Sequence, residues 1–294
     1  MGDDQQARLT DGLFQRLDWL HAELRRNSGY LARQEIERLV DGLRANPHRL
    51  EQYGYKVYSQ NDEDGILAEI FRRIDLSAGV FCEIGVENGL ECNTLWLLHR
   101  GWRGGWLEAN EVQRPAIEQK FQSLLTTKRL ALAIGRLAPG NVNGALRQVL
   151  SSLDLGLDEL DFLSIDVDGM DIYLLEALEC APKVICIEYN AKFPPPVSKV
   201  PVYQEDYVWR FGDYMGSSLT AVNEAAVAKG YSLVATNLTG VNAFFVRNDL
   251  VKDRFEKDLT PENLYNPPRY YLTYDHYSGS VGHRADFGPY TDIA

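Results

Sequence analysis

The chain has 294 residues, of which 45% are hydrophobic and 24% charged, enough for one large α/β domain with additions or for two domains. Its net charge of -12 would repel a nucleic-acid backbone or an anionic membrane surface, and no local basic patch is visible. No stretch approaches the roughly 18 apolar residues of a membrane span, and the start MGDDQQ lacks the basic flank of a signal peptide. We therefore expect no nucleic-acid partner, no membrane span and a cytoplasmic location.

The four cysteines support the same compartment. Cys82, Cys92, Cys180 and Cys186 fall inside predicted strands or helices, and their spacing is neither CxxC nor a Cys/His ligand pattern. A disulfide framework or a zinc site is therefore not indicated.

The first 50 residues are predicted to be helical. Two apolar stripes recur at helical spacing, and Asn46-Pro47 closes the second. The stripes consist of Leu13, Leu17, Leu20 and Leu24, followed by Ile36, Leu39, Val40 and Leu43. Residues 1–52 form an N-terminal helical extension on this interpretation. Its helices either pack on the main domain or join two copies of the chain as a homodimer.

A polar, acidic segment precedes the next predicted helix. Tyr58 to Ile74 reads YSQNDEDGILAEIFRRI, and its apolar residues share one helix face. Ser59 or Asn61 would cap this helix. Alternatively, the polar side chains of the segment, including Gln60, face a ligand at the sheet edge.

A strand, a glycine turn and a second strand follow. The strand Val80 to Ile84 leads into Gly85 and Gly89, and the strand from Gly105 ends in Glu108. Glycines at such a turn allow a ligand to approach the backbone closely, and an acid that ends the next strand can accept both hydroxyls of a ribose. The pattern predicts a unit that binds a nucleoside cofactor.

The acids in this unit indicate which cofactor it takes. The pattern is Glu83-x-Gly85-x-x-x-Gly89 with Glu87 in the loop, whereas a dinucleotide site presents helix amides to a pyrophosphate. Acidic side chains repel phosphate but suit a ligand that has an ammonium group and no phosphate. S-adenosylmethionine is such a ligand, and Glu83, Gly85, Gly89 and Glu108 are its predicted contacts.

Acids and an amide also end the fourth and fifth predicted strands. Asp166 follows Asp161 to Ile165, and Glu188 and Asn190 follow Val184 to Ile187. The carboxyl ends of neighbouring parallel strands meet at one edge, where open α/β sheets bind ligands. Asp166 is therefore the first choice for a general base, a cofactor contact or a metal ligand. Glu188 is its catalytic partner, and Asn190 would join both as a third ligand for magnesium, or for calcium.

Two further acids lie between these strands. Asp168 precedes Gly169 in a turn dipeptide but would also complete the oxygen-rich site. Asp171 is predicted to be the N-cap of the helix that follows, Ile172 to Leu178.

The remaining elements complete a sheet. Helices are predicted from about Glu91 to Gly101 and from about Val142 to Leu153, and the polar turn after the strand Leu130 to Ile134 would lie along an adenine. Tyr231 to Thr236 and Asn242 to Val246 read as a hairpin joined by Asn237-Leu238-Thr239-Gly240. β-α units that end in a hairpin make a mostly parallel sheet with helices on both faces.

Two aromatic stretches are predicted on the acceptor side. Residues 191–218, which follow the fifth strand, are too long and aromatic for a plain connection and read as a lid-like insertion. Residues 251–294 form a tyrosine-rich C-terminal segment that packs on the domain or stacks on sugars. Its tyrosines are Tyr265, Tyr270, Tyr271, Tyr274, Tyr277 and Tyr290.

Six motifs in this order resemble those of class I S-adenosylmethionine-dependent methyltransferases, and more narrowly of the FkbM-type family. They are YSQNDEDGIL (Tyr58 to Leu67), FCEIGVENGLECNT (Phe81 to Thr94), GWRGGWLEAN (Gly101 to Asn110), SIDVDGMD (Ser164 to Asp171), IEYN (Ile187 to Asn190) and GYSLVATNLTGVNAFFVR (Gly230 to Arg247). The resemblance covers about two thirds of the chain. The first loop departs from the Asp-x-Gly-x-x-x-Gly form of characterised members because it carries Glu83 and Glu87.

The resemblance implies a Rossmann-like α/β fold with a seven-stranded, mostly parallel sheet and an antiparallel terminal hairpin, formed by residues 53–250. It also implies transfer of a methyl group to a hydroxyl of a small sugar, polyol or natural-product acceptor. The alternative is a non-catalytic module of the same fold that recruits a partner through its N-terminal helices.

Overall fold

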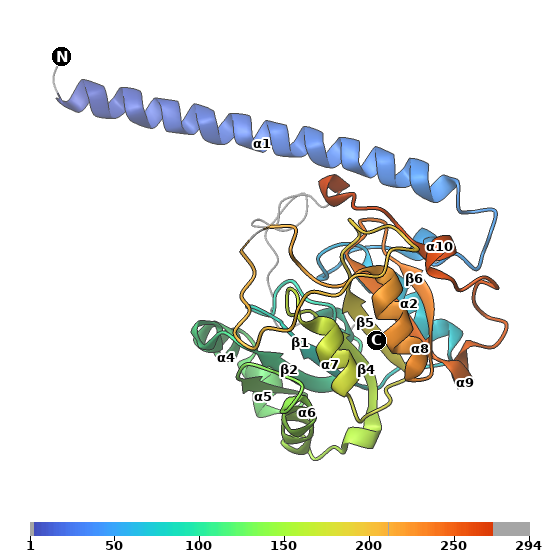
Figure 1. The fold of residues 1–294 in the computed structure, drawn as a ribbon. Coiled ribbons are helices and arrows are strands. Elements are labelled where there is room, and N and C mark those ends of the chain that lie inside the picture. The colour runs from blue at the N-terminus through green and yellow to red at the C-terminus, as the bar shows by residue number, and fades with distance from the viewer. Residues whose placement is uncertain (1–2, 211, 273–294) are drawn as a thin grey trace, which may run out of the picture.

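A computed structural model describes residues 3–210 and 212–272, and its centre is a seven-stranded sheet (Figure 1). The strands lie in the order β3-β2-β1-β4-β5-β7-β6. Their bounds are β1 Val80–Ile84, β2 Arg103–Glu108, β3 Leu130–Ile134, β4 Leu160–Ile165, β5 Val184–Glu188, β6 Tyr231–Thr236 and β7 Asn242–Arg247.

Strand direction confirms the predicted fold class. β1 pairs in parallel with both β2 and β4, and β4 pairs in parallel with β5. β7 is inserted between β5 and β6 and is antiparallel to both. A mostly parallel seven-stranded sheet of this order with one reversed strand is the class I methyltransferase topology. Because the chain moves outward from β1 on one side and from β4 on the other, the order reverses between these two strands.

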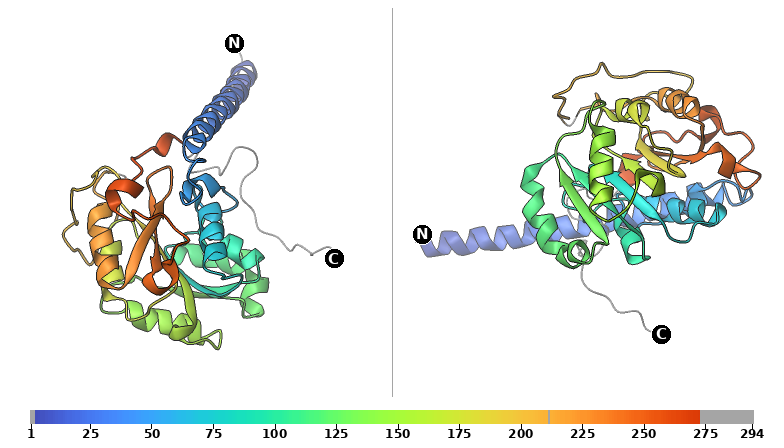
Figure 2. Two further views of the ribbon diagram at one scale, coloured as in Figure 1. Left: turned by 90° about the vertical axis from the view of Figure 1, so that its right-hand side faces the viewer. Right: turned by 90° about the horizontal axis from the view of Figure 1, so that it is seen from below.

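Helices cover both faces of the sheet, as predicted (Figure 2). One apolar core lies under α2 to α5, and a second lies under α6 to α8. The bounds are α2 Glu63–Arg73, α3 Leu95–His99, α4 Arg114–Lys120, α5 Gln122–Thr126, α6 Val142–Ser151, α7 Asp171–Ala177, α8 Leu219–Ala228, α9 Asn248–Val251 and α10 Pro261–Leu264. The strands are mainly apolar because both faces of the sheet are covered, and every residue of β5 is buried.

The N-terminal extension contains a single long helix, α1 (Asp3–Asp41), which projects from the body of the protein (Figures 1 and 2). At 1.5 Å per residue its 39 residues extend over about 58 Å. Only its C-terminal part approaches the body, where it contacts the short turn Tyr270–Leu272. The helical character is as predicted, and the role as a dimerisation arm stays a prediction.

The helix after β1 is shorter than the sequence suggests. It was expected to begin near Glu91, but α3 begins at Leu95. The backbone N–H groups of Asn93 and Thr94 donate to the Glu83 carboxylate instead of entering a helix. The predicted end at Gly101 agrees with the structure, because α3 stops at His99 and Gly101 has a φ of +87°.

Three further predictions concerned the cysteines, membrane spans and the tyrosine-rich segment. All four cysteines are free thiols, and no helix in the described part of the chain is long and apolar enough to cross a membrane. In the tyrosine-rich segment, Tyr265 donates to the carbonyl of Ala191 while Tyr271 is largely exposed. Tyr274, Tyr277 and Tyr290 lie outside the described residues.

Gly85 and Gly101 provide a matched test of close packing at the β1 turn. Both have a positive φ, +83° and +87°. A Cβ on Gly85 would lie 1.7 Å from the carbonyl oxygen of Asp166, whereas a Cβ on Gly101 would meet no atom within 4 Å. We expect Gly101→Ala to lower the free energy of unfolding by about 1 kcal/mol, and Gly85→Ala to lower it by roughly 3 kcal/mol more. Urea unfolding of both variants measures the difference, and equal losses would contradict the contact.

Candidate functional site

The glycine turn after β1 lies against the end of β4, where the strand order reverses. The N–H of Gly85 donates to Leu107 O at 2.8 Å, and the N–H of Asp166 donates to Ile84 O at 3.0 Å. The carboxyl ends of β2, β1 and β4 are therefore joined by backbone hydrogen bonds. Open α/β sheets bind their ligands at such a reversal.

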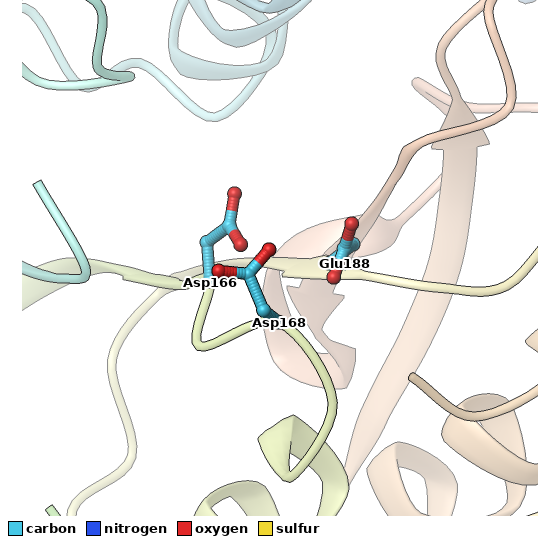
Figure 3. A group of neighbouring side chains, drawn as sticks. All are labelled: Asp166, Asp168 and Glu188. Carbon is cyan, nitrogen blue, oxygen red and sulfur yellow. The ribbon is translucent and has the colours of Figure 1, made fainter. Parts of the chain in front are cut away.

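Three carboxylates gather at this edge: Asp166, Asp168 and Glu188 (Figure 3). Each offers one oxygen, and these oxygens all lie within 4.8 Å of one another. Asp166 and Asp168 come from the segment after β4, and Glu188 ends β5. Glu188 is only 5% exposed, and its Oε2 has no hydrogen-bond partner in the described chain.

Burial and mutual repulsion disfavour the charged forms of these acids. Burial is the main reason that the pKa values of Asp166 and Glu188 lie well above their usual range, and the charge of Asp168 raises both further. Burial also raises the pKa of Asp168, with a smaller contribution from Glu108. A cation among these groups would relieve the repulsion. Three oxygen donors, one of them buried and unpartnered, fit magnesium or calcium better than zinc.

Asn190 binds the segment that follows β5. Its amide donates to the carbonyls of Asp213 and Met215 at 2.9 and 2.7 Å, and its Oδ1 accepts from the N–H of Lys192 at 3.1 Å. The side chain thus holds the segment that leaves β5. Asp168, which the turn dipeptide had left undecided, is the third acid of the cluster, and its φ is +58°.

Asp171 orders the loop before its helix. α7 begins at Asp171 itself, so the predicted N-cap position is occupied by Met170. The Asp171 carboxylate accepts from the N–H groups of Val167 and Gly169 at 2.8 and 2.9 Å. These bonds fix the turn that carries Asp168. Burial raises the pKa of Asp171 to about 6 in spite of them.

The buried carboxylate of Glu83 accepts hydrogen bonds from the segment that follows β1. Its Oε1 accepts from Asn93 N at 2.8 Å, and its Oε2 accepts from Thr94 N and Oγ1 at 3.0 and 2.5 Å. Trp106 in turn donates to Thr94 Oγ1 at 2.8 Å. With both oxygens occupied and 2% exposure, Glu83 shapes the glycine loop instead of facing the crevice. Burial raises its pKa to about 7.

Glu108 reaches the glycine loop from the end of β2. Its Oε2 accepts from the N–H groups of Val86 and Glu87 at 3.1 and 2.8 Å, and its Oε1 accepts from Asn110 N at 2.7 Å. Burial raises the pKa of Glu87, and the charges of Asp168 and Glu108 raise it further. Acids from three strand ends therefore share this crevice.

The second glycine of the motif is required by packing. Gly89 has a φ of +77°, and a Cβ on it would lie 2.5 Å from the ring of Trp106 and 2.9 Å from that of Phe121. Only glycine allows the loop to pass over these rings.

The polar segment before α2 is held by carboxylates, and Ser59 Oγ accepts from the N–H of Asp64 in the first turn of the helix at 3.1 Å. Asp62 is the N-cap residue and makes no capping bond. Asp64 Oδ2 accepts from the N–H groups of residues 57–59 at 2.7 to 2.9 Å. The backbone carbonyl of Gln60 accepts from Lys56 Nζ at 2.9 Å. This arrangement keeps Gln60 next to the acids of α2.

A buried amide network joins this segment to the terminal hairpin. Glu63 Oε1 accepts from the amides of Asn61, Asn237 and Asn242 at 2.9, 2.7 and 2.9 Å. Asn242 is the register partner of Glu188 in the sheet. Sequence reasoning assigned Asn237 only to a turn, and nothing in the local pattern signals contact with a residue so far along the chain.

A hollow of about 750 Å³ lies at the carboxyl end of β3. It is lined by Leu107, the segment Ile134–Leu137, Gly140, Asn141 and one face of α6. Gly135 N donates to Glu108 O at 2.8 Å, so the hollow is adjacent to the end of β2. The three clustered acids do not line it.

Residues 191–218 cross the same edge. A Cβ on Gly169 would lie 2.5 Å from the ring of Tyr207, and the side chain of Arg136 donates to the carbonyl of Tyr207. Tyr173 donates to Pro201 O at 2.8 Å. The segment therefore spans from the β3 loop to the acids after β4.

Comparison with known proteins gives matches among solved structures alone. No protein-family model and no curated protein matches the sequence. A protein described as a caffeoyl-CoA O-methyltransferase from Staphylococcus aureus shares 13% identity and a TM-score of 0.44, over 73% of this chain and 99% of that one.

Two other solved structures contain the product of the cofactor. An O-methyltransferase from Bacillus cereus in complex with SAH has 17% identity and a TM-score of 0.39, over 73% of this chain and 88% of that one. TrmK of M. capricolum with S-adenosyl-homocysteine has 11% identity and a TM-score of 0.36, over 64% and 71%. Because these sequence identities and TM-scores are low, the fold is assigned from the strand order of this chain and not from the comparisons.

Asp62 gives a pH-dependent test of the acidic segment. Its Oδ1 is buried without a partner, and burial and the charge of Glu63 raise its pKa to about 8. The folded chain keeps a proton at Asp62 that the unfolded chain releases near pH ~4, so its contribution to stability falls as the pH rises from ~4 to ~8. We expect Asp62→Asn to raise the free energy of unfolding by about 1 kcal/mol at pH ~8 and to change it little at pH ~4.

Asp64→Ala is the matched control in the same urea titrations. It removes the acceptor of three backbone N–H groups and should lower stability by about 2 kcal/mol. If Asp62→Asn instead lowers the stability at pH ~8, the Asp62 carboxylate has hydrogen-bond partners and the prediction is wrong.

Proposed function

We propose that the protein is an S-adenosylmethionine-dependent O-methyltransferase that acts on a hydroxyl of a small sugar, polyol or natural-product acceptor. The observation that carries the proposal is the concentration of acids at the point where the strand order reverses: Glu87, Glu108, Asp166, Asp168 and Glu188 approach one another there. Such an edge attracts a positively charged ligand and repels a phosphate. A sulfonium cofactor with an ammonium group is such a ligand.

The cofactor would bind at the carboxyl ends of β1, β2 and β3. Glu108 would exchange its bonds to the loop amides for bonds to the ribose hydroxyls, and the adenine would enter the hollow beside Ile134–Leu137. Gly85 and Gly89 would allow the cofactor to approach the loop, with Asp166 and Gln60 beside it. Glu83 would act by holding the loop in shape.

The acceptor half would occupy the ends of β4 and β5. Methyl transfer is an in-line displacement, so the protein has to align the acceptor hydroxyl with the methyl group and take its proton. A carboxylate with a raised pKa is a stronger base, and burial raises the pKa values of Asp166 and Glu188, which favours these two as the catalytic acids.

A divalent cation fits the same acids. Asp166, Asp168 and Glu188 would hold magnesium, and the bound cation would favour ionisation of an acceptor hydroxyl. Residues 191–218 would then cover the acceptor as a lid, because Tyr207 is in contact with the segment that carries Asp168.

The bonds of Glu108 favour the second candidate. With its carboxylate already occupied by the N–H groups of Val86, Glu87 and Asn110, the chain could serve as a non-catalytic module that recruits a partner through α1. Retention of the cellular role in Asp166→Asn and Glu188→Gln, with its loss on deletion of residues 1–50, would favour this alternative.

Binding of the cofactor tests the first half of the proposal. We expect saturable binding of S-adenosylmethionine by calorimetry and a loss of roughly 100-fold in affinity in Glu108→Ala, because two hydroxyl bonds to a charged acceptor disappear. Glu111→Ala, an exposed acid three positions on, is the control. Circular dichroism checks that both variants are folded. Unchanged affinity in folded Glu108→Ala would refute the assignment.

Thermal unfolding tests the acidic cluster. Magnesium, manganese or calcium should raise the unfolding temperature of the wild type, and Glu188→Gln should lose this shift. In EDTA, Glu188→Gln should be about 1 kcal/mol more stable than the wild type, because it removes a buried, unpaired charge. Glu176→Gln, an exposed acid of α7, should keep the wild-type response. A full cation response in Glu188→Gln would exclude this site.

A further inference from the structure

The outer part of α1 carries an unpartnered apolar stripe. Its five leucines recur at alternating steps of four and three residues, with Asn27 at the one polar position, and they are 40% to 63% exposed. They are Leu13, Leu17, Leu20, Leu24 and Leu31. This is the spacing of a coiled-coil seam, in which each leucine inserts between side chains of a second helix.

The stripe faces away from the body of the protein. Among residues 10–41 of this helix, Gly29 and Ala32 are buried, and Ile36 is half-buried one turn further on. At 100° per residue these three lie on one side of the helix, and the leucine stripe lies about 125° around from them. Leu31 is 63% exposed although its neighbour Ala32 is buried. Within the described part of the chain, docking of α1 on the body therefore leaves the leucines of the stripe exposed.

We infer that α1 forms an antiparallel coiled coil with α1 of a second copy of this chain. The two helices are aligned so that their leucine stripes face each other in opposite directions. In this register Leu13 packs against the partner's Leu24, and Leu17 packs against the partner's Leu20. The two-fold axis repeats both contacts, which gives four layers made only of leucine. Thr10 then lies opposite the partner's Asn27, so the polar position of the stripe faces another polar side chain.

Charge favours the antiparallel direction. In this register Arg16 flanks the seam next to the partner's Glu23, and symmetry makes the pair twice. A parallel dimer would bring Arg16 beside the partner's His21 instead. Within its own helix Glu23 also binds Arg26 at 2.6 Å, an exposed pair that adds little stability. Asp11, nearer the N-terminus, would run beside the basic stretch of the partner that contains the partner's Arg26.

The antiparallel arrangement leaves room for both bodies. Each body docks near residue 35 of its own helix, about 125° around the helix from the seam. The two docking positions are therefore about 50 Å apart along the axis of the coiled coil. No part of the candidate functional site lies in this interface, so the inference stands independently of the proposed function.

Sedimentation of the full chain tests the dimer. We expect the wild type to be dimeric at about 50 µM chain, and Leu20→Glu to raise the dissociation constant by roughly 100-fold or more, because it introduces a charge into two leucine layers. Trp19→Glu is the matched control, since Trp19 is 63% exposed but lies off the stripe. A monomeric wild type, or a dimer lost in Trp19→Glu and kept in Leu20→Glu, would overturn the inference.

Cysteine crosslinking in a Cys180→Ser background tests the direction. A mixture of Thr10→Cys and Asn27→Cys chains should form a disulfide between the two, whereas Asn27→Cys alone should not crosslink to itself. Efficient crosslinking of Asn27→Cys alone would establish a parallel dimer and overturn the register. Arg16→Glu and Glu23→Arg should each weaken the dimer by several fold, and the double variant should restore it.

Discussion

The cost of burying a carboxylate organises the functional edge of this protein. Several acids there accept hydrogen bonds from backbone N–H groups: Asp64 Oδ2 holds residues 57–59, Glu83 holds the loop after β1, and Asp171 holds the turn after β4. Burial raises the pKa values of Asp166 and Glu188, and the Oε2 of Glu188 has no hydrogen-bond partner in the described chain. One residue type thus has two roles, and the presence or absence of amide donors separates the acids that build the site from those free to do chemistry.

This division explains why the edge is both rigid and unstable. The satisfied acids fix the glycine loop and the turn of Asp168, so the unsatisfied ones cannot move apart to reduce their repulsion. The chain therefore stores electrostatic free energy at one place, which a positively charged ligand or a cation would release on binding. We therefore expect the protein without a bound cation or cationic ligand to be less stable than the protein with one.

The sequence predicted what depends on local periodicity and strand position. The strands, the hairpin and the edge that collects the acids follow from apolar runs, turn residues and the geometry of parallel sheets. The partners of individual polar side chains depend on contacts distant in sequence. The sequence did not predict the bonds of Asn190 to the segment after β5, nor those of Asn237 and Asn242 to Glu63. Helix starts failed for the same reason, since Glu83 captures the amides that would have begun α3 earlier.

The bond from Arg136 to the carbonyl of Tyr207 connects two halves of the edge that the sheet itself keeps apart. Arg136 belongs to the loop beside the hollow, and Tyr207 lies against the turn of the clustered acids. One crossing segment therefore contacts both halves, and we expect the uncovering of one half to be coupled to that of the other. If the two halves hold cofactor and acceptor, their exchange with solvent is governed by one gating event, and steady-state kinetics would then show an ordered or concerted release of the two products instead of independent dissociation.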